Sequence, residues 1–308
     1  MLPVYEKNNG LLFYPVQYEG EELSKNVFYT GAAPNQQAIP AVEYLMSKDG
    51  GSAKRWVLLG TDYVFPRTAN KVLKAFLMAK GVKEADIAEE YTPFGHKDYQ
   101  TIVGKIKSFA AGGKACVLST INGDSNVPFY KEFANQGLTA ADCPVMAFSV
   151  AEDELRAMDV PPLVGHLAAW NYFQTVDTPA SKKFAAAFKA KYGEKRVVND
   201  PMEAAYTMVY LWKQAVEKAK TYEDLEKVRA AAIGQSFEAP NGRVVMNANH
   251  HISKIVRIGK VRADGLFDII NSTPAPVEPL PWNQYVAETK GYACDWSDAK
   301  KGGKYKKA

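Results

Sequence analysis

The chain has 308 residues, of which 47% are hydrophobic, enough for a packed core. Lys and Arg number 38 against 34 Asp and Glu, so the formal net charge is only +4. So small an excess creates no strong field for nucleic acid or an anionic membrane, and no nucleic-acid partner is expected. The three cysteines, Cys116, Cys143 and Cys294, have neither zinc nor redox-pair spacing, and their disulfide status stays open.

The first fifty residues predict a helix end, two strands and a further helix. Residues 2–10 resemble the last turns of a helix closed by a glycine. Residues 11–16 and 27–29 have the length and apolar content of strands, and a helix is expected over residues 34–47. The Asp-Gly-Gly-Ser sequence at 49–52 indicates a flexible link, where we expect the chain to cross into a second lobe.

A regular alternation of strands and helices follows. We expect strands at residues 55–60, 87–91, 115–120, 144–149 and 163–173, separated by helices at 66–81, 98–109 and 125–136. Alternation of this kind produces right-handed crossovers and a parallel sheet covered on both faces. The sequence therefore predicts the α/β class.

The last third of the chain predicts helices first and short strands afterwards. Helices are expected at 178–192, 200–220 and 221–234, and strands at 243–246, 252–258 and 266–270. A proline-rich stretch and a lysine-rich end follow, and the lysine run is typical of a solvated terminus.

Four strand ends carry hydroxyl, amide or backbone groups beside aromatic rings, at residues 29–31, 60–63, 119–124 and 170–173. In an open parallel sheet, ligands bind in the crevice outside the carboxyl ends of the strands. Apolar walls with a few polar groups are typical of a small-molecule pocket, although an ordinary strand–turn–helix unit has the same pattern. Asp62 and Arg67 are expected to pair outside the pocket, so the ligand should be neutral.

No catalytic or metal-binding motif accompanies these strand ends. The four histidines have no neighbours at metal or catalytic-triad spacing. The chain also lacks a Gly-x-Ser-x-Gly elbow, a His-Glu-x-x-His pair and a phosphate-binding loop. We therefore expect a binding protein and no enzyme, with no catalytic residue, metal or cofactor. An amidohydrolase is the weakest alternative.

Several segments in order resemble one known family. They are F-Y-T-G-A-A-P-N-Q-Q from Phe28, T-D-Y-V-F-P-R from Thr61, S-T-I-N-G-D-S-N from Ser119, W-N-Y-F-Q from Trp170, D-T-P-A-S from Asp177 and D-P-M-E-A-A-Y from Asp200. From about Leu2 to Trp296 the chain resembles the urea-binding component of bacterial urea ABC transporters. More broadly, it is similar to the amide- and urea-binding branch of type I periplasmic binding proteins, which are related to branched-chain amino acid-binding proteins.

The resemblance implies two lobes, each a parallel sheet flanked by helices, that close on a ligand between them. Lobe 1 would comprise residues 1–48 and 174–250, and lobe 2 residues 49–173 and 251–308. The crossovers would lie near 48–54, 170–177 and 250–262. Members of the family begin with a signal peptide and further residues, so the resemblance also implies that the first lobe is incomplete and lacks amino-terminal strands.

The family's ligand-binding positions fall on ten residues of this chain. They are Tyr29, Thr30, Gly31 and Ala32 in the first lobe, Tyr63, Phe65, Asn122 and Gly123 in the second, and Tyr172 and Phe173 near a crossover. Amide-binding relatives have proline at the position of Ala32, so the choice between urea and a short-chain amide stays open.

The function implied is that of a periplasmic receptor. It would bind urea or a short-chain amide between the lobes and deliver it to the ABC permease subunits in the membrane. The alternative is a cytoplasmic amide-sensing regulatory protein with the same fold.

Overall fold

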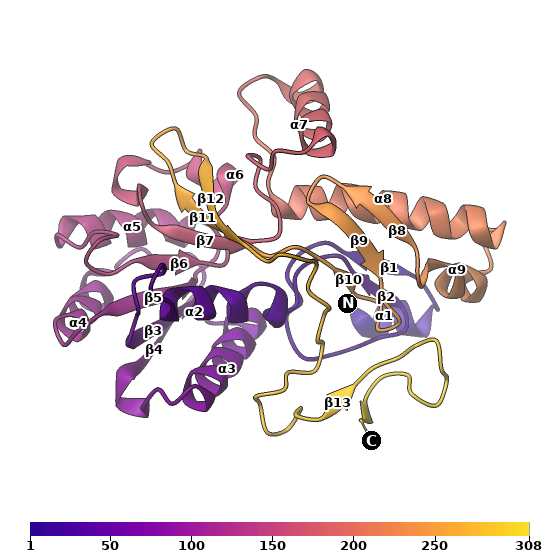
Figure 1. The fold of residues 1–308 in the computed structure, drawn as a ribbon, viewed down its shortest axis with the longest axis horizontal. Coiled ribbons are helices and arrows are strands. Elements are labelled where there is room, and N and C mark those ends of the chain that lie inside the picture. Colours follow the sequence, from indigo (N-terminus) through magenta and orange to yellow (C-terminus); the bar gives the residue numbers. More distant parts are fainter. Residues whose placement is uncertain (308) are drawn as a thin grey trace.

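The alternating stretch folds into the larger of two α/β units in the computed structural model, which describes residues 1–307 (Figure 1). A seven-stranded sheet with the order β12-β11-β7-β6-β5-β3-β4 forms its centre. Five of its strands run parallel because a crossover connection separates each from the next. They are β3 (Arg55–Thr61), β4 (Ile87–Thr92), β5 (Ala115–Thr120), β6 (Val145–Ala147) and β7 (Leu167–Trp170).

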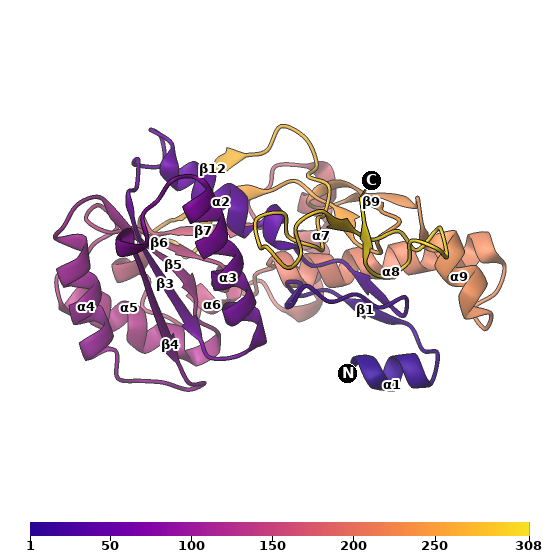
Figure 2. The ribbon, with the colours of Figure 1, turned by 90° about the horizontal axis from the view of Figure 1, so that it is seen from below.

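Helices cover both faces of this sheet (Figure 2). Alternate residues of β3 point to opposite faces: Trp56 and Leu58 pack with α2 and α3, whereas Val57 and Leu59 pack with α4 and α5. The helices are α2 (Ala38–Met46), α3 (Val64–Ala79), α4 (Gln100–Ala110), α5 (Asn126–Asn135) and the short α6 (Glu152–Leu155). The 3-10 turns are η1 (Pro34–Gln36), η2 (Glu84–Asp86), η3 (Gly123–Ser125) and η4 (Pro161–Leu163).

The position of α2 differs from the sequence prediction. We expected this helix in the first lobe, with the crossing at residues 49–52. Instead, Val42 and Leu45 are fully buried beside Trp56 and Leu73 of the large unit. The apolar face of α2 is therefore already on the large sheet, and the chain passes between the units before this helix.

Two antiparallel strands extend the large sheet. β11 (Arg257–Val261) pairs antiparallel with both β7 and β12 (Phe267–Ser272). The chain enters β11 directly from the small unit, with no helical crossover, and then turns back at a tight turn containing Gly265 (φ +76°). The sequence did not indicate this change of direction.

The small unit contains two short sheets and four helices. β1 (Leu12–Tyr14) and β2 (Val27–Tyr29) are parallel, whereas β8 (Ser236–Ala239), β9 (Gly242–Met246) and β10 (Ile252–Ser253) are antiparallel. Strand β8, which forms a hairpin with β9, was not predicted from the sequence. The helices are α1 (Leu2–Lys7), α7 (Pro179–Tyr192), α8 (Asp200–Ala219) and α9 (Leu225–Ala232).

The two-lobed α/β arrangement confirms the predicted fold class. The sheets differ from the expectation, because both lobes also contain antiparallel strand pairs. Three connections link the units, at residues 30–37, 171–178 and 254–256. The carboxyl-terminal segment, with β13 (Tyr292–Ala293) and β14 (Tyr305–Lys306), touches both units: Val286 joins the α2–α3 cluster and Trp296 faces His250.

The three cysteines are buried, and none of them forms a disulfide. Burial raises the pKa of Cys116 well above its usual value, so this thiol is inert. Among residues 1–307, no helix is both long enough and apolar enough to cross a membrane.

Candidate functional site

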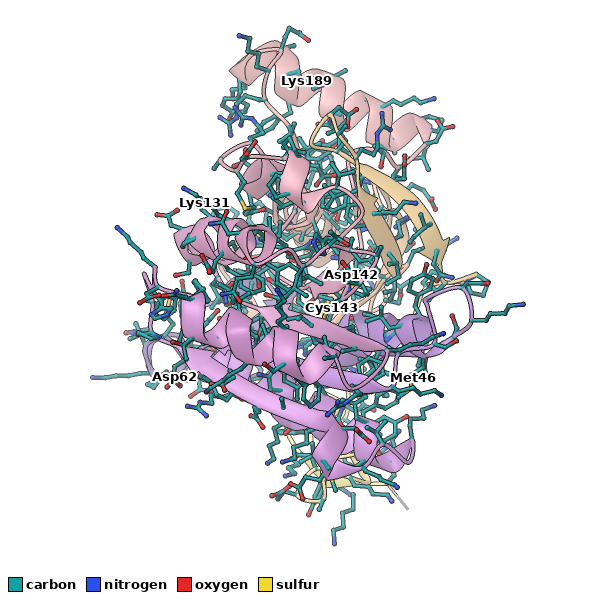
Figure 3. All side chains as sticks on the ribbon, turned by 90° about the vertical axis from the view of Figure 1, so that its left-hand side faces the viewer. Met46, Asp62, Lys131, Asp142, Cys143 and Lys189 are labelled. Carbon is teal, nitrogen blue, oxygen red and sulfur yellow. The ribbon has the colours of Figure 1, made fainter. Side chains whose placement is uncertain are left out.

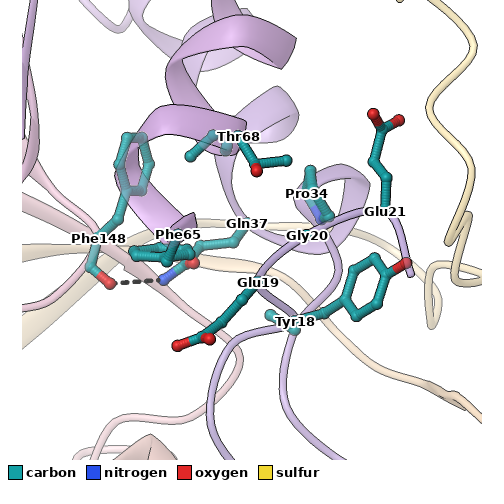
Figure 4. Close-up of a pocket in the computed structure, with 12 residues that line it drawn as sticks. Tyr18, Glu19, Gly20, Glu21, Pro34, Gln37, Phe65, Thr68 and Phe148 are labelled. Atoms are coloured by element: carbon teal, nitrogen blue, oxygen red, sulfur yellow. Dashed lines mark hydrogen bonds between the residues drawn. The ribbon is translucent and has the colours of Figure 1, made fainter. Parts of the chain in front are cut away.

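A small cavity of about 20 Å³ lies between the two units, beside the connection that follows β2 (Figure 4). This volume holds about one water molecule without any movement of the walls. Most of the wall is apolar. The lining residues are Tyr18, Glu19, Gly20, Glu21, Ala32, Pro34, Gln37, Ala38, Phe65, Thr68, Ala69 and Phe148.

A larger, open cavity of about 500 Å³ adjoins the small one. It lies over one face of the β1–β2 sheet, and Glu19 and Gly20 line both cavities. The start of α3 borders both, through Val64 in one and Phe65 in the other. The lining residues are Met1, Leu2, Leu12, Tyr14, Glu19, Gly20, Glu22, Val27, Tyr29 and Val64. We define the two cavities together as the interlobe site.

The polar side chains of the interlobe site are acidic, amide or hydroxyl groups, and its lining includes no Lys, Arg or His. Glu22 accepts a hydrogen bond from the Tyr29 hydroxyl at 2.8 Å, and burial raises the pKa of Glu22. Burial, with the nearby charge of Glu19, also raises the pKa of Tyr14. A site of this kind suits a ligand that donates N–H groups and disfavours an anion.

Gln37 fixes the back of the small cavity. Its Nε2 donates to the Phe148 carbonyl at 3.1 Å (Figure 4). The same Nε2 donates to the Ala169 carbonyl at 2.7 Å. Gln17 donates to the same Phe148 carbonyl at 2.6 Å. Two segments from the small-unit side are thereby tied to the carboxyl ends of β6 and β7, as expected for a site outside a parallel sheet.

The four residues predicted in the first lobe lie together at the end of β2. Tyr29 lines the larger cavity and Ala32 the smaller one. Thr30 is fully buried, and its backbone N–H donates to the Tyr14 carbonyl at 2.9 Å. Gly31 has no space for a side chain, because an added Cβ would lie 1.6 Å from the Val16 carbonyl oxygen.

The four residues predicted in the second lobe are less closely grouped. Phe65 lines the small cavity. The centroid of the Tyr63 ring lies 6.4 Å from the centroid of the Phe65 ring. Asn122 Nδ2 donates to the Tyr63 hydroxyl at 3.0 Å, whereas Gly123 is exposed at the start of η3 with φ +64°. Burial, with a contribution from the Glu19 charge, raises the pKa of Tyr63 to about 12.

Tyr172 and Phe173 lie at the second connection, but they line neither cavity. Both are fully buried. The Tyr172 hydroxyl lies 3.0 Å from Ser181 Oγ, and the Phe173 ring packs on Phe267 at 4.7 Å. Their side chains pack into the cores on either side of the connection, so their contacts are structural.

Asp62 and Arg67 form the pair expected outside the pocket. Arg67 Nε and Nη2 lie 2.8 and 3.0 Å from the two Asp62 oxygens. Both side chains are about half exposed, and Figure 3 shows Asp62 at the rim of the large unit. A solvated pair of this kind contributes little to stability and places no charge in the interlobe site.

Two parts of the site were not predicted from the sequence: the acidic and aromatic segment Tyr18-Glu19-Gly20-Glu21-Glu22 and the amide of Gln37. The segment has neither strand nor helix periodicity, so the sequence pattern assigns it no element. The available signal was its composition: a tyrosine, three carboxylates and a glycine next to a strand are unusual for a connection with no other role.

The comparison with protein families identifies the class. The model described as "Periplasmic binding protein domain" matches residues 1–288. The chain therefore belongs to the periplasmic binding protein domain family.

Solved structures show the same fold. A solute-binding protein of an ABC transporter from Rhodopseudomonas palustris HaA2, in complex with p-hydroxybenzoic acid, has a TM-score of 0.76 and 20% identity, over 89% of this chain and 75% of that one. An amino acid ABC transporter substrate-binding protein from Pseudomonas fluorescens Pf-5 has a TM-score of 0.74 and 18% identity, over 94% and 76%. A leucine-binding protein from Thermotoga maritima has a TM-score of 0.72 and 18% identity, over 88% and 75%. The fold is thus that of type I periplasmic binding proteins.

A curated relative carries a different name. A protein from Geobacillus stearothermophilus named limonene hydroxylase is 32% identical over 124 residues. The match covers 40% of this chain and 23% of that protein. The match therefore concerns under a quarter of the named protein.

Proposed function

We propose that the chain is a periplasmic solute-binding receptor of an ABC transporter, which binds urea or a short-chain amide in the interlobe site and delivers it to the permease. The observation that carries the proposal is an interlobe site whose lining offers hydrogen-bond acceptors and no basic side chain. The family assignment and the shared fold support the receptor role.

The site chemistry favours urea over the ligands named for the structural relatives. Urea is small and neutral, and it presents four N–H donors and one acceptor. Glu19 and Gln37 line the small cavity, and a carboxylate and an amide oxygen can each accept a hydrogen bond from such donors. A benzoate or an amino acid would bring a carboxylate among acidic groups, with no Arg or Lys in the lining to pair with it.

A calorimetric titration with urea, acetamide, formamide, leucine and 4-hydroxybenzoate tests the proposal. We expect urea to bind more tightly than acetamide, because the acetamide methyl leaves an acceptor of the site unpaired. With four heavy atoms, urea gains at most about 6 kcal/mol, a dissociation constant of tens of micromolar. Equal binding of urea and acetamide would overturn the preference for urea, and a preference for 4-hydroxybenzoate would overturn the ligand class.

Tyr63→Phe tests the second-lobe side of the site. Loss of the hydroxyl removes the acceptor of the Asn122 hydrogen bond, while the ring remains. We expect urea binding to weaken by about 0.5–1.5 kcal/mol with the fold intact. Tyr44→Phe is the matched control, because its hydroxyl bonds only to Asp49 in an exposed turn. An unchanged affinity in Tyr63→Phe would show that the hydroxyl contributes nothing to binding.

A further inference from the structure

A fully buried lysine lies where the chain passes between the units. Lys254 follows β10 on the third connection, and its side chain has 0% exposure. Its Nζ donates to the Thr30 carbonyl at 2.9 Å, on the first connection. The same Nζ lies 3.9 Å from Asp200 Oδ2. Burying an ammonium group costs free energy unless the group is paired and hydrogen-bonded. The folded structure therefore depends on the contacts of Lys254 with Thr30 and Asp200.

Asp200 carries the link to the second connection. This residue is in the first turn of α8, where the helix dipole favours a negative charge. Its Oδ2 accepts hydrogen bonds from the backbone N–H groups of Asn171 and Tyr172, at 3.0 and 2.9 Å. The Lys254–Asp200 pair therefore touches all three connections between the units.

Further buried polar contacts surround this pair. Asn171 Nδ2 donates to the carbonyls of Gln36 and Ile255, both at 3.0 Å. Arg257 donates to the Asn171 carbonyl and, at 2.8 Å, to the Asn241 carbonyl. Hydrogen bonds and charges in a low-dielectric interior have strict geometry, whereas apolar contacts tolerate sliding. The relative direction of the connections is thus set by polar contacts.

We propose that Lys254 is a positioning residue for the interlobe site, which holds the three connections in one arrangement through Thr30 and Asp200 and so sets the equilibrium between open and closed sites. Thr30 lies between Tyr29 and Ala32, which line the site, so its carbonyl couples the lysine to the ligand-facing segment. The ligand part of this inference rests on the proposed function, whereas the positioning of the units does not.

The test compares Lys254→Met, which keeps the chain length and removes the charge, with Asp200→Asn, which keeps an acceptor oxygen and weakens the pair. Lys260→Met is the matched control, because Lys260 is exposed on β11. Spin labels on Cys substituted for the exposed Lys131 of α5 and Lys218 of α8 report the distance between the units. The native cysteines are buried and should remain unlabelled.

We expect Lys254→Met and Asp200→Asn to broaden or shift the distance distribution without any ligand, and Lys260→Met to leave it unchanged. We also expect roughly tenfold weaker urea binding in both variants, because part of the population no longer has the binding arrangement. Circular dichroism and thermal unfolding check that each variant is folded.

Folded variants with the wild-type distance distribution would overturn the proposal. Failure of both variants to fold would also count against it, because the pair would then serve the fold itself. If the wild type shows no response to urea, the proposed function fails, while the ligand-free distances still decide the role of Lys254.

Discussion

The two units obtain their stability in different ways. In the large unit, helices cover both faces of one seven-stranded sheet, and apolar side chains fill two continuous clusters. In the small unit, the strands form two separate sheets, and rings stack in pairs such as Tyr29 on His251 at 4.4 Å. A sheet with two covered faces needs only the right apolar pattern, whereas a small core depends on particular side chains.

The surfaces differ in the same sense. α3 of the large unit turns Val72, Leu73, Phe76 and Leu77 inward, and all four are fully buried. α8 of the small unit buries Leu211 but leaves Val209 55% exposed and Trp212 42% exposed. The short sheets of the small unit cover only part of the apolar surface of this helix. We therefore expect the small unit to open first when the protein is destabilised.

The largest expected effect comes from removing one core phenylalanine in each unit. Phe129 and Phe28 are both fully buried, and Phe28 stacks on Phe13 at 5.0 Å. Phe129→Ala and Phe28→Ala should each cost about 3–5 kcal/mol of unfolding free energy. Hydrogen exchange should show that each variant weakens protection mainly in its own unit. Equal loss in both units from either variant would mean that they unfold as one.

Glu152 gives the large unit a stability that falls as pH rises. It is fully buried beside the second connection, accepts from the Gln174 N–H at 2.7 Å, and its pKa is raised to about 8 by burial. Between the usual carboxyl pKa and 8, the folded protein binds the additional proton, so the unfolding free energy decreases with pH, on the order of a few kcal/mol. Glu152→Gln should make the unfolding free energy, measured by chemical denaturation from pH 5 to 9, depend less on pH. An unchanged slope would exclude Glu152 as its cause.

In the small unit, His251 should make the unfolding free energy fall as the pH decreases, which is opposite to the effect of Glu152. Burial lowers the pKa of His251 to about 3, and neither ring nitrogen has a hydrogen-bond partner. From the usual histidine pKa down to 3, only the unfolded chain gains this proton, so stability is lost as pH falls. His251→Phe keeps a ring against Tyr29 and should move the acid unfolding midpoint to lower pH. His96→Phe, at an exposed turn, is the control and should not move it.

The smallest changes in unfolding free energy are expected from replacing glycine by alanine at a crowded position, Gly31, and at an open helical position, Gly104. Gly31→Ala should destabilise the protein by about 1–3 kcal/mol, because its Cβ would meet the Val16 backbone at 1.6 Å. Gly104 lies inside α4, and the nearest atom to an added Cβ is 3.8 Å away. Gly104→Ala should therefore stabilise by about 0.5–1 kcal/mol. Thermal unfolding measures whether each variant is more or less stable than the wild type. A Gly31→Ala variant as stable as the wild type would show that the segment at Val16 can move.

The sequence by itself determined the α/β class and most helices and strands of the large unit. Apolar periodicity in α3 and the buried strand β5 is a local property that survives in the folded protein. The family resemblance also implied Ala32 and Phe65 as ligand-binding positions, and both line the small cavity of the interlobe site. The pairing of Asp62 with Arg67 followed from five residues of sequence separation and complementary charge.

Only the tertiary structure decided which groups meet across the chain. The interlobe site joins Glu19 and Gln37 to Phe148, more than a hundred residues away, and no periodicity marks such a contact. Lys254 and Asp200 are equally invisible as a pair, because each is an ordinary charged residue until burial forces it to find a partner. Tyr172 shows the converse: a polar aromatic at a strand end is a ligand candidate in sequence, and the fold buries it against Ser181.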